Sequence, residues 1–221
     1  MKTLKSIFVS NRFFFGCYLF FFAVGLLLLL AMGKAGAFVD LNPYHRTTLD
    51  TVFAWITFLG DGTFSLIVFV LFLGMRRWSW AIQIIVAFLL SGLLSQVLKR
   101  LFSMPRPMQF FPAGQYPYFI KGITHIGFAS FPSGHSTTIF ALATLLAIFT
   151  KDRRLKIVCL LCAVLVGYSR IYLGQHFLGD VLMGSCLGIA TAVLVRWLFV
   201  QNRRSWPAWL SHDPADRQVD R

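Results

Sequence analysis

The chain alternates between long apolar runs and short polar breaks. Each run approaches the ~20 residues that an α-helix needs to cross the hydrocarbon core of a membrane. Helices suit such runs because every backbone group is then hydrogen-bonded within the segment. The pattern predicts an all-α integral membrane protein, a six-transmembrane-helix bundle. Its spans are expected at about residues 13–31, then from a start around 55–62 to residue 75, and then at 79–98, 136–150, 156–172 and 178–200.

Composition agrees with this interpretation. Hydrophobic residues make up 57% of the 221 positions and charged residues 13%, and 24 positions are phenylalanine. Globular domains average about 45–50% apolar and about 25% charged residues. The expected divisions are an N-terminal membrane helix with an external connector (1–55), a core domain (56–200) and a mobile cytoplasmic tail (201–221).

The first run has a second interpretation. It follows a basic segment and precedes Ala35-Gly36-Ala37, so it resembles a secretory signal with a small-residue cleavage site. Its length exceeds that of a typical signal core and is close to a full span. A retained first helix is therefore favoured, and residue 40 lies outside the cell on either interpretation.

The net charge of +13 raises the question of a nucleic-acid partner. The positions of the charges argue against one. If the chain crosses at every apolar run, the basic clusters all fall on one side, which is the positive-inside pattern. This places both termini in the cytoplasm of a multi-pass cell (inner) membrane protein, with clusters at residues 2–12, 76–77, 151–156 and 203–204.

Two further segments are ambiguous from sequence. Cys159 and Cys162 form a C-x-x-C spacing, but they lie inside an apolar run, so packing is favoured over metal or redox chemistry. The 99–131 segment is rich in proline, which argues against helix, and in aromatic residues, which suit a membrane interface. No metal or other cofactor is expected.

Three polar blocks interrupt the apolar sequence. They are residues 99–107, 132–135 and 169–180. Between His135 and Arg170 lie 34 residues with a basic turn in the middle, which is room for one helical hairpin. The chain therefore returns to the same side, and all three blocks meet at the non-cytoplasmic (periplasmic) face. Ionisable residues at such positions are costly and indicate function.

The first block supplies Lys99 and Arg106, with Pro107 fixing the backbone after the arginine. A guanidinium group matches phosphate oxygens in a bidentate way, and an ammonium group adds a point charge. Snorkelling of Lys99 to the interface is an alternative explanation for that residue.

The second block contains Ser133, Gly134 and His135 directly before an apolar run. The serine can cap the helix, the glycine allows close backbone approach, and free N–H groups at a helix start bind phosphate. The alternative is an ordinary capped helix with an incidental histidine.

The third block contains Arg170, then His176 and Asp180. The last two are four residues apart, so they share a helical face if a helix begins near residue 175. A carboxylate on one imidazole nitrogen fixes the tautomer and leaves the other nitrogen free to attack. A purely structural histidine–aspartate bond is the alternative.

Together the blocks resemble the three-part signature of the type 2 phosphatidic acid phosphatase superfamily, K-x6-RP, PSGH and SR-x5-H-x3-D. The resemblance implies a six-helix bundle with a metal-free site at the outer face. It implies that His176 attacks phosphorus, Asp180 orients it, and His135 protonates the leaving oxygen and then activates water. The phosphate oxygens would be held by Lys99, Arg106, Ser133, Gly134 and Arg170.

The expected activity is therefore hydrolysis of a lipid phosphate or diphosphate through a phosphohistidine. Candidate substrates are a polyprenyl diphosphate, phosphatidylglycerol phosphate, phosphatidic acid or a lipid A phosphate. The alternatives are a phosphotransferase that uses the same histidine and, more distantly, an anion transporter. The expected partners are the lipid phosphate and the bilayer; the oligomeric state stays open. The run at 136–150 spans only about 22 Å as a helix, which predicts a catalytic layer sunk to headgroup depth.

Overall fold

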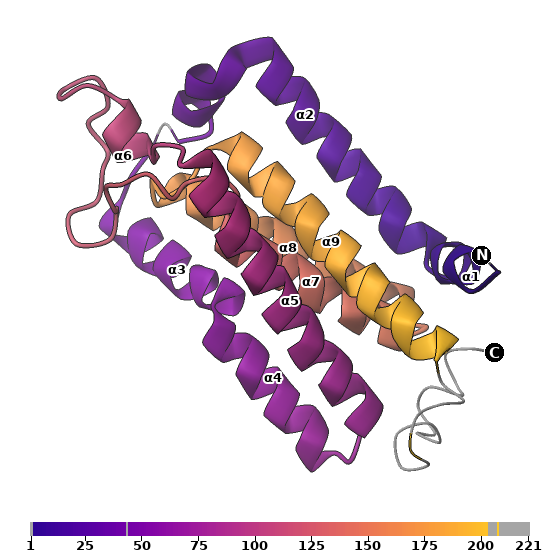
Figure 1. The fold of residues 1–221 in the computed structure, drawn as a ribbon. Coiled ribbons are helices and arrows are strands. Elements are labelled where there is room, and N and C mark those ends of the chain that lie inside the picture. The colour runs from indigo at the N-terminus through magenta and orange to yellow at the C-terminus, as the bar shows by residue number, and fades with distance from the viewer. Residues whose placement is uncertain (1, 43, 203–206, 208–221) are drawn as a thin grey trace.

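The computed structural model describes residues 2–42, 44–202 and 207, and this part of the chain is helical with connecting loops (Figure 1). The long helices from residue 78 onward begin and end within a few residues of the expected apolar runs, whereas the helices before residue 78 differ from them. In chain order they are α1 (Lys2–Ser10), α2 (Arg12–Asp40), α3 (Thr47–Thr57), the 3-10 turn η1 (Phe58–Gly60), α4 (Gly62–Gly74), α5 (Trp78–Phe102), α6 (Pro107–Phe110), α7 (Gly134–Phe149), α8 (Arg153–Tyr172) and α9 (Leu178–Gln201).

Helices that are long and apolar enough to cross a membrane account for part of the expected six-helix bundle. Among the described residues, α2, α5, α8 and α9 are long and apolar enough to cross a membrane. The segment from α3 to α4 adds a fifth crossing if it is counted as one span bent by 53°. Helix α7 is apolar but has only 16 residues. Most of the tail expected at 201–221 lies outside the described residues.

The second span was placed wrongly at its start. Helix α2 continues to Asp40, with a break at Gly33 (φ 68°), and α3 begins at Thr47, so only residues 41–46 connect the two helices. The expected division at residue 55 falls inside α3. Asp61 breaks the span because its backbone is extended (φ −73°, ψ 148°), and its side chain caps α4 by accepting the Thr63 N–H at 2.8 Å.

Helix α7 lies at the centre of the bundle, where α5, α8 and α9 pack around it (Figure 1). Nearly all of its side chains are buried. Helix α9 approaches it at Gly184 and Gly188, where a Cβ would lie 2.6 Å from the Ser133 carbonyl oxygen and 2.4 Å from the Thr137 carbonyl oxygen. The G-x-x-x-G spacing thus permits backbone contact between the two helices that carry the second and third polar blocks.

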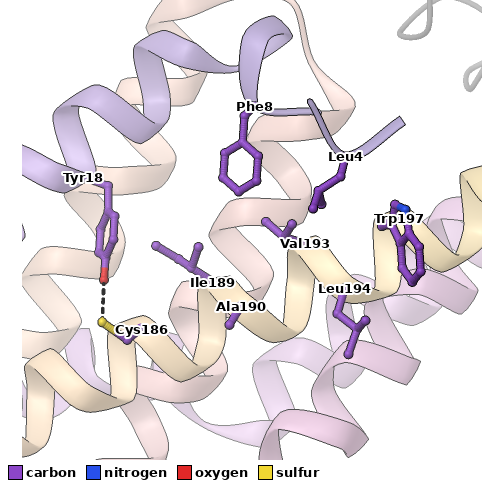
Figure 2. A pocket seen from close by; sticks show the side chains of 9 residues that line it. All are labelled: Leu4, Phe8, Tyr18, Cys186, Ile189, Ala190, Val193, Leu194 and Trp197. Carbon is purple, nitrogen blue, oxygen red and sulfur yellow. Dashed lines mark hydrogen bonds between the residues drawn. The ribbon is translucent and has the colours of Figure 1, made fainter. Parts of the chain in front are cut away.

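The N-terminal helices pack on α9 and α8. Tyr18 of α2 lies 3.1 Å from the Ser185 hydroxyl, and Lys156 of α8 donates to Asn11 Oδ1 at 2.5 Å. An apolar groove of about 570 Å³ lies between these helices and α9 (Figure 2). Its lining residues are Leu4, Phe8, Tyr18, Cys186, Ile189, Ala190, Val193, Leu194 and Trp197.

The loop between α5 and α7 is held by an aromatic cluster. Tyr116 is buried at its centre and donates to the Asn42 carbonyl at 2.9 Å. Its ring lies 5.1 Å from Phe38 and 4.8 Å from Phe119. Phe38 in turn lies 5.4 Å from Phe177, the residue after His176. The loop is therefore packed onto the end of the bundle.

Candidate active site

The fold brings all three polar blocks to one end of the bundle. Lys99 lies in the last turn of α5 and Arg170 in the last turn of α8. Arg106 directly precedes α6, the second block begins α7, and His176 and Asp180 lie at the start of α9. Electrostatic interactions link Lys99 with Arg106, Arg170 and Asp180. Every predicted site residue thus belongs to one cluster.

His176 and Asp180 form the buried pair at its centre. Their side chains are 3% and 4% exposed, and His176 Nδ1 lies 3.5 Å from Asp180 Oδ2. The same carboxylate oxygen accepts the Ser130 hydroxyl at 2.5 Å and the Phe177 N–H at 2.9 Å. These donors fix the carboxylate. Nε2 of His176 is therefore the ring nitrogen that Asp180 leaves free.

The surroundings of His176 favour its neutral form. Burial lowers the pKa of His176 to about 4, although Asp180 opposes this shift. Arg170 and Lys99 lower the pKa further because their charges repel a protonated ring. The imidazole is therefore unprotonated at neutral pH, as a nitrogen nucleophile must be.

The start of α7 meets the start of α9. Ser133 is the N-cap residue of α7: its Oγ accepts the Ser136 N–H at 3.3 Å. Its own N–H donates to the Asp180 carbonyl at 3.0 Å. A Cβ on Gly134 would lie 3.9 Å from Lys99 Cε, so the lysine passes over this helix start. Backbone N–H groups at a helix start and a cation together suit an anion.

Each cation is held by a neutral partner. Lys99 donates to the Ala129 carbonyl at 2.6 Å, Arg106 to Gln175 Oε1 at 2.5 Å and Arg170 to Thr57 Oγ1 at 2.6 Å. Gln175 is buried and also donates to the Ile123 carbonyl. Burial lowers the pKa of Arg106. The three side chains are fixed in place while their positive charges stay available.

His135 faces a carboxylate that the sequence analysis did not assign to the site. Its Nε2 lies 4.0 Å from Asp61 Oδ2, at the break between η1 and α4. Sequence reasoning also missed Thr57, Ser130 and Gln175. A carboxylate between two apolar segments was a usable signal for Asp61. The three neutral residues carry no such signal.

Comparison with known proteins gives consistent matches. A family model described as "PAP2 superfamily" matches residues 80–204. Lipid A 1-phosphatase of Rhizobium johnstonii is 34% identical over 111 residues, 50% of this chain and 44% of that protein, so the match spans less than half of its length.

A second relative and a solved structure match a larger share of the chain. Phosphatidylglycerophosphatase B of Bacillus subtilis is 33% identical over 75% of this chain and 80% of its own length. The crystal structure of a transmembrane PAP2 type phosphatidylglycerolphosphate phosphatase from Bacillus subtilis superposes with a TM-score of 0.62 and 26% identity, covering 91% of this chain and 98% of that one.

Proposed function

This chain belongs to the PAP2 superfamily, and on that premise we propose that it is a membrane enzyme that hydrolyses a lipid phosphate or diphosphate without a metal ion. The substrate classes that fit are a lipid A phosphate, phosphatidylglycerol phosphate, a polyprenyl diphosphate and phosphatidic acid. The first two correspond to the names of the relatives above.

The first step forms a phosphohistidine. Nε2 of His176 attacks phosphorus in line while the bond to the leaving oxygen breaks, and His135 gives that oxygen a proton. Asp180 stabilises the positive charge that develops on His176, since its carboxylate lies 3.5 Å from Nδ1. Lys99, Arg106 and Arg170 stabilise the equatorial oxygens, a role that charge and positioning fulfil in phosphoryl transfer.

The second step releases phosphate. His135, now neutral, takes a proton from a water molecule, whose oxygen attacks phosphorus as the bond to His176 breaks. The enzyme returns to its starting protonation state, and inorganic phosphate leaves.

The observation that carries this proposal is the excess of fixed positive charge around a neutral, buried histidine. Arg170 Nε is buried and has no hydrogen-bond partner in the described part of the chain. A bound phosphate would supply its acceptor and offset the repulsion among Lys99, Arg106 and Arg170. A divalent metal usually supplies this charge in phosphoryl transfer, and here three cations would take its place.

The membrane arrangement is part of the proposal. Six crossings, with α7 as a short buried one of about 24 Å and α3–α4 as a bent one, place both termini in the cytoplasm and the site on the periplasmic side. A span this short supports a catalytic layer at headgroup depth, so that the lipid phosphate reaches His176 without leaving the bilayer.

The test is phosphate release by the purified full-length chain in detergent micelles. The panel contains a phospholipid phosphate, a polyprenyl diphosphate and lipid A, each with and without chelator. We expect release from at least one lipid that chelator leaves intact and His176→Ala abolishes. Loss that Mg²⁺ restores would contradict metal independence, and turnover by His176→Ala would contradict the nucleophile.

A phosphotransferase is the second candidate, because a phosphohistidine can pass its phosphoryl group to a lipid hydroxyl instead of water. Adding an acceptor lipid to the same assay separates the two. Hydrolysis predicts free phosphate at an unchanged rate; transfer predicts a labelled acceptor lipid at the expense of free phosphate.

A further inference from the structure

We propose that Asp61 is a positioning residue whose charge favours the protonated, proton-donating form of His135. This inference rests on the proposed function, in which His135 is the general acid. It adds a carboxylate from the bent second span, outside the three polar blocks, to the machinery.

The packing of the bend sets Asp61 beside His135. A Cβ at Gly60 would lie 3.0 Å from His135 Cβ and 3.1 Å from its carbonyl oxygen, so only glycine lets the η1 turn rest on the start of α7. The extended backbone of the next residue then turns the Asp61 carboxylate toward the ring, with Oδ2 4.0 Å from Nε2.

The distance suits a charge effect. A distance of 4.0 Å is longer than a hydrogen bond, so Asp61 does not accept the ring N–H of His135. That proton therefore stays available to the leaving oxygen. An opposite charge within about 4–6 Å still favours the protonated imidazole by about 1–3 pH units. The two side chains are 31% and 45% exposed, which places the expected effect at the lower end of this range.

Burial of the His135 ring, which is the largest influence, and the other charges that face it work in the opposite direction. Lys99 from α5, Arg170 from α8 and His176 from the loop before α9 all disfavour a second positive charge on the ring, and Asp61 favours it. A general acid surrounded by cations needs a counter-charge, and Asp61 is the carboxylate that faces it among the described residues.

A structural role has to be separated from this one, because Asp61 also caps α4. Asp61→Asn keeps an oxygen for the Thr63 N–H and removes only the charge. Asp152 offers a matched control: it caps α8 by accepting the Arg154 N–H at 2.7 Å, at the opposite end of that helix from the site.

The experiment measures kcat and KM against pH for the full-length wild type, Asp61→Asn, Asp61→Glu and Asp152→Asn. Two substrates are compared: the lipid phosphate that the wild type hydrolyses fastest, and p-nitrophenyl phosphate, whose leaving group needs little protonation. Failure of the wild type on every lipid phosphate would refute the proposed function itself. Activity with the profiles described next tests Asp61 alone.

For the lipid, we expect Asp61→Asn to lower kcat at least about tenfold, within the range that general acid catalysis contributes. The alkaline limb of its pH–rate profile should move down by about one pH unit. The aryl phosphate should change less than about twofold, Asp61→Glu should restore the alkaline limb, and Asp152→Asn should match wild type. An unmoved alkaline limb, or equal losses on both substrates, would overturn the assignment.

Discussion

The contact between α7 and α9 gives a prediction that follows from backbone geometry. In Gly188→Ala the new methyl carbon would lie 2.4 Å from the Thr137 carbonyl oxygen and 2.8 Å from the Ala141 nitrogen. Both are backbone atoms of a central helix, so neither can rotate aside. Relieving the overlap to an ordinary contact of about 3.4 Å requires the helices to separate by about 1 Å.

The size of the effect follows from that displacement. Overpacking a well-packed core costs about 1–3 kcal/mol, which for a chain of this size lowers the melting temperature by about 2–12 °C. The same displacement reaches the site, since α7 carries His135 and α9 carries Asp180. A misplacement of about 1 Å can cost about 100-fold in rate.

The assay is thermal unfolding of the detergent-solubilised chain together with phosphate release from its best lipid substrate. Gly92→Ala in α5 is the matched control, because a Cβ there meets nothing within 4 Å. Alanine should stabilise that helix slightly or leave it unchanged. If Gly188→Ala had the same melting temperature as Gly92→Ala and kept the full kcat, the inferred backbone contact would be refuted.

Three other changes test separate parts of the structure. Gln175→Glu keeps an acceptor for Arg106 but neutralises its charge, and it loses the N–H that Gln175 donates to the Ile123 carbonyl. The KM for a lipid phosphate should therefore rise about tenfold, and the free energy of unfolding should fall by about 1–3 kcal/mol. An unchanged KM would contradict the phosphate role of Arg106. His176 has a pKa near 4 in the folded protein, so between about pH 6.5 and 4 the unfolded chain binds a proton that the folded protein does not. The free energy of unfolding, measured by denaturant titration, should therefore fall by up to about 3 kcal/mol as the pH drops through this window. His176→Asn should lack that fall. Asn11→Ala removes the buried acceptor of Lys156 and should cost about 1–3 kcal/mol in denaturant titration with kcat unchanged, whereas an unchanged stability would show that the N-terminal helices do not depend on this contact.

Much of the fold could be predicted because apolar runs and basic clusters are properties of the sequence itself. The third, fifth and sixth spans agree with α5, α8 and α9 to within a few residues. The start of the second span could not be predicted, because the 47–57 segment mixes polar and apolar residues and becomes helical in contact with α8. The approach of Asp61 to His135 could not be predicted either, because it arises where the turn at Gly60 packs on the start of α7.

The site was predictable to the extent that its residues are charged. Lysine, arginine, histidine and aspartate cost free energy when they lie in or near a membrane, so their presence in an apolar chain indicates a function. Neutral polar residues such as Thr57, Ser130 and Gln175 carry no comparable signal in the sequence. Their importance lies in hydrogen bonds of 2.5–2.6 Å, which they make to Arg170, Asp180 and Arg106 respectively. Those distances arise from packing between segments up to 113 residues apart in sequence.

The charges of the site are divided by type. Each histidine lies beside one carboxylate, His176 beside Asp180 and His135 beside Asp61. Each cation is held by a neutral acceptor. Had carboxylates held the cations, the site would be neutral toward phosphate; had neutral groups faced the histidines, neither imidazole would have a counter-charge when it turns cationic. Under the proposed function, this division would give the carboxylates to proton chemistry and leave the cations for the phosphate.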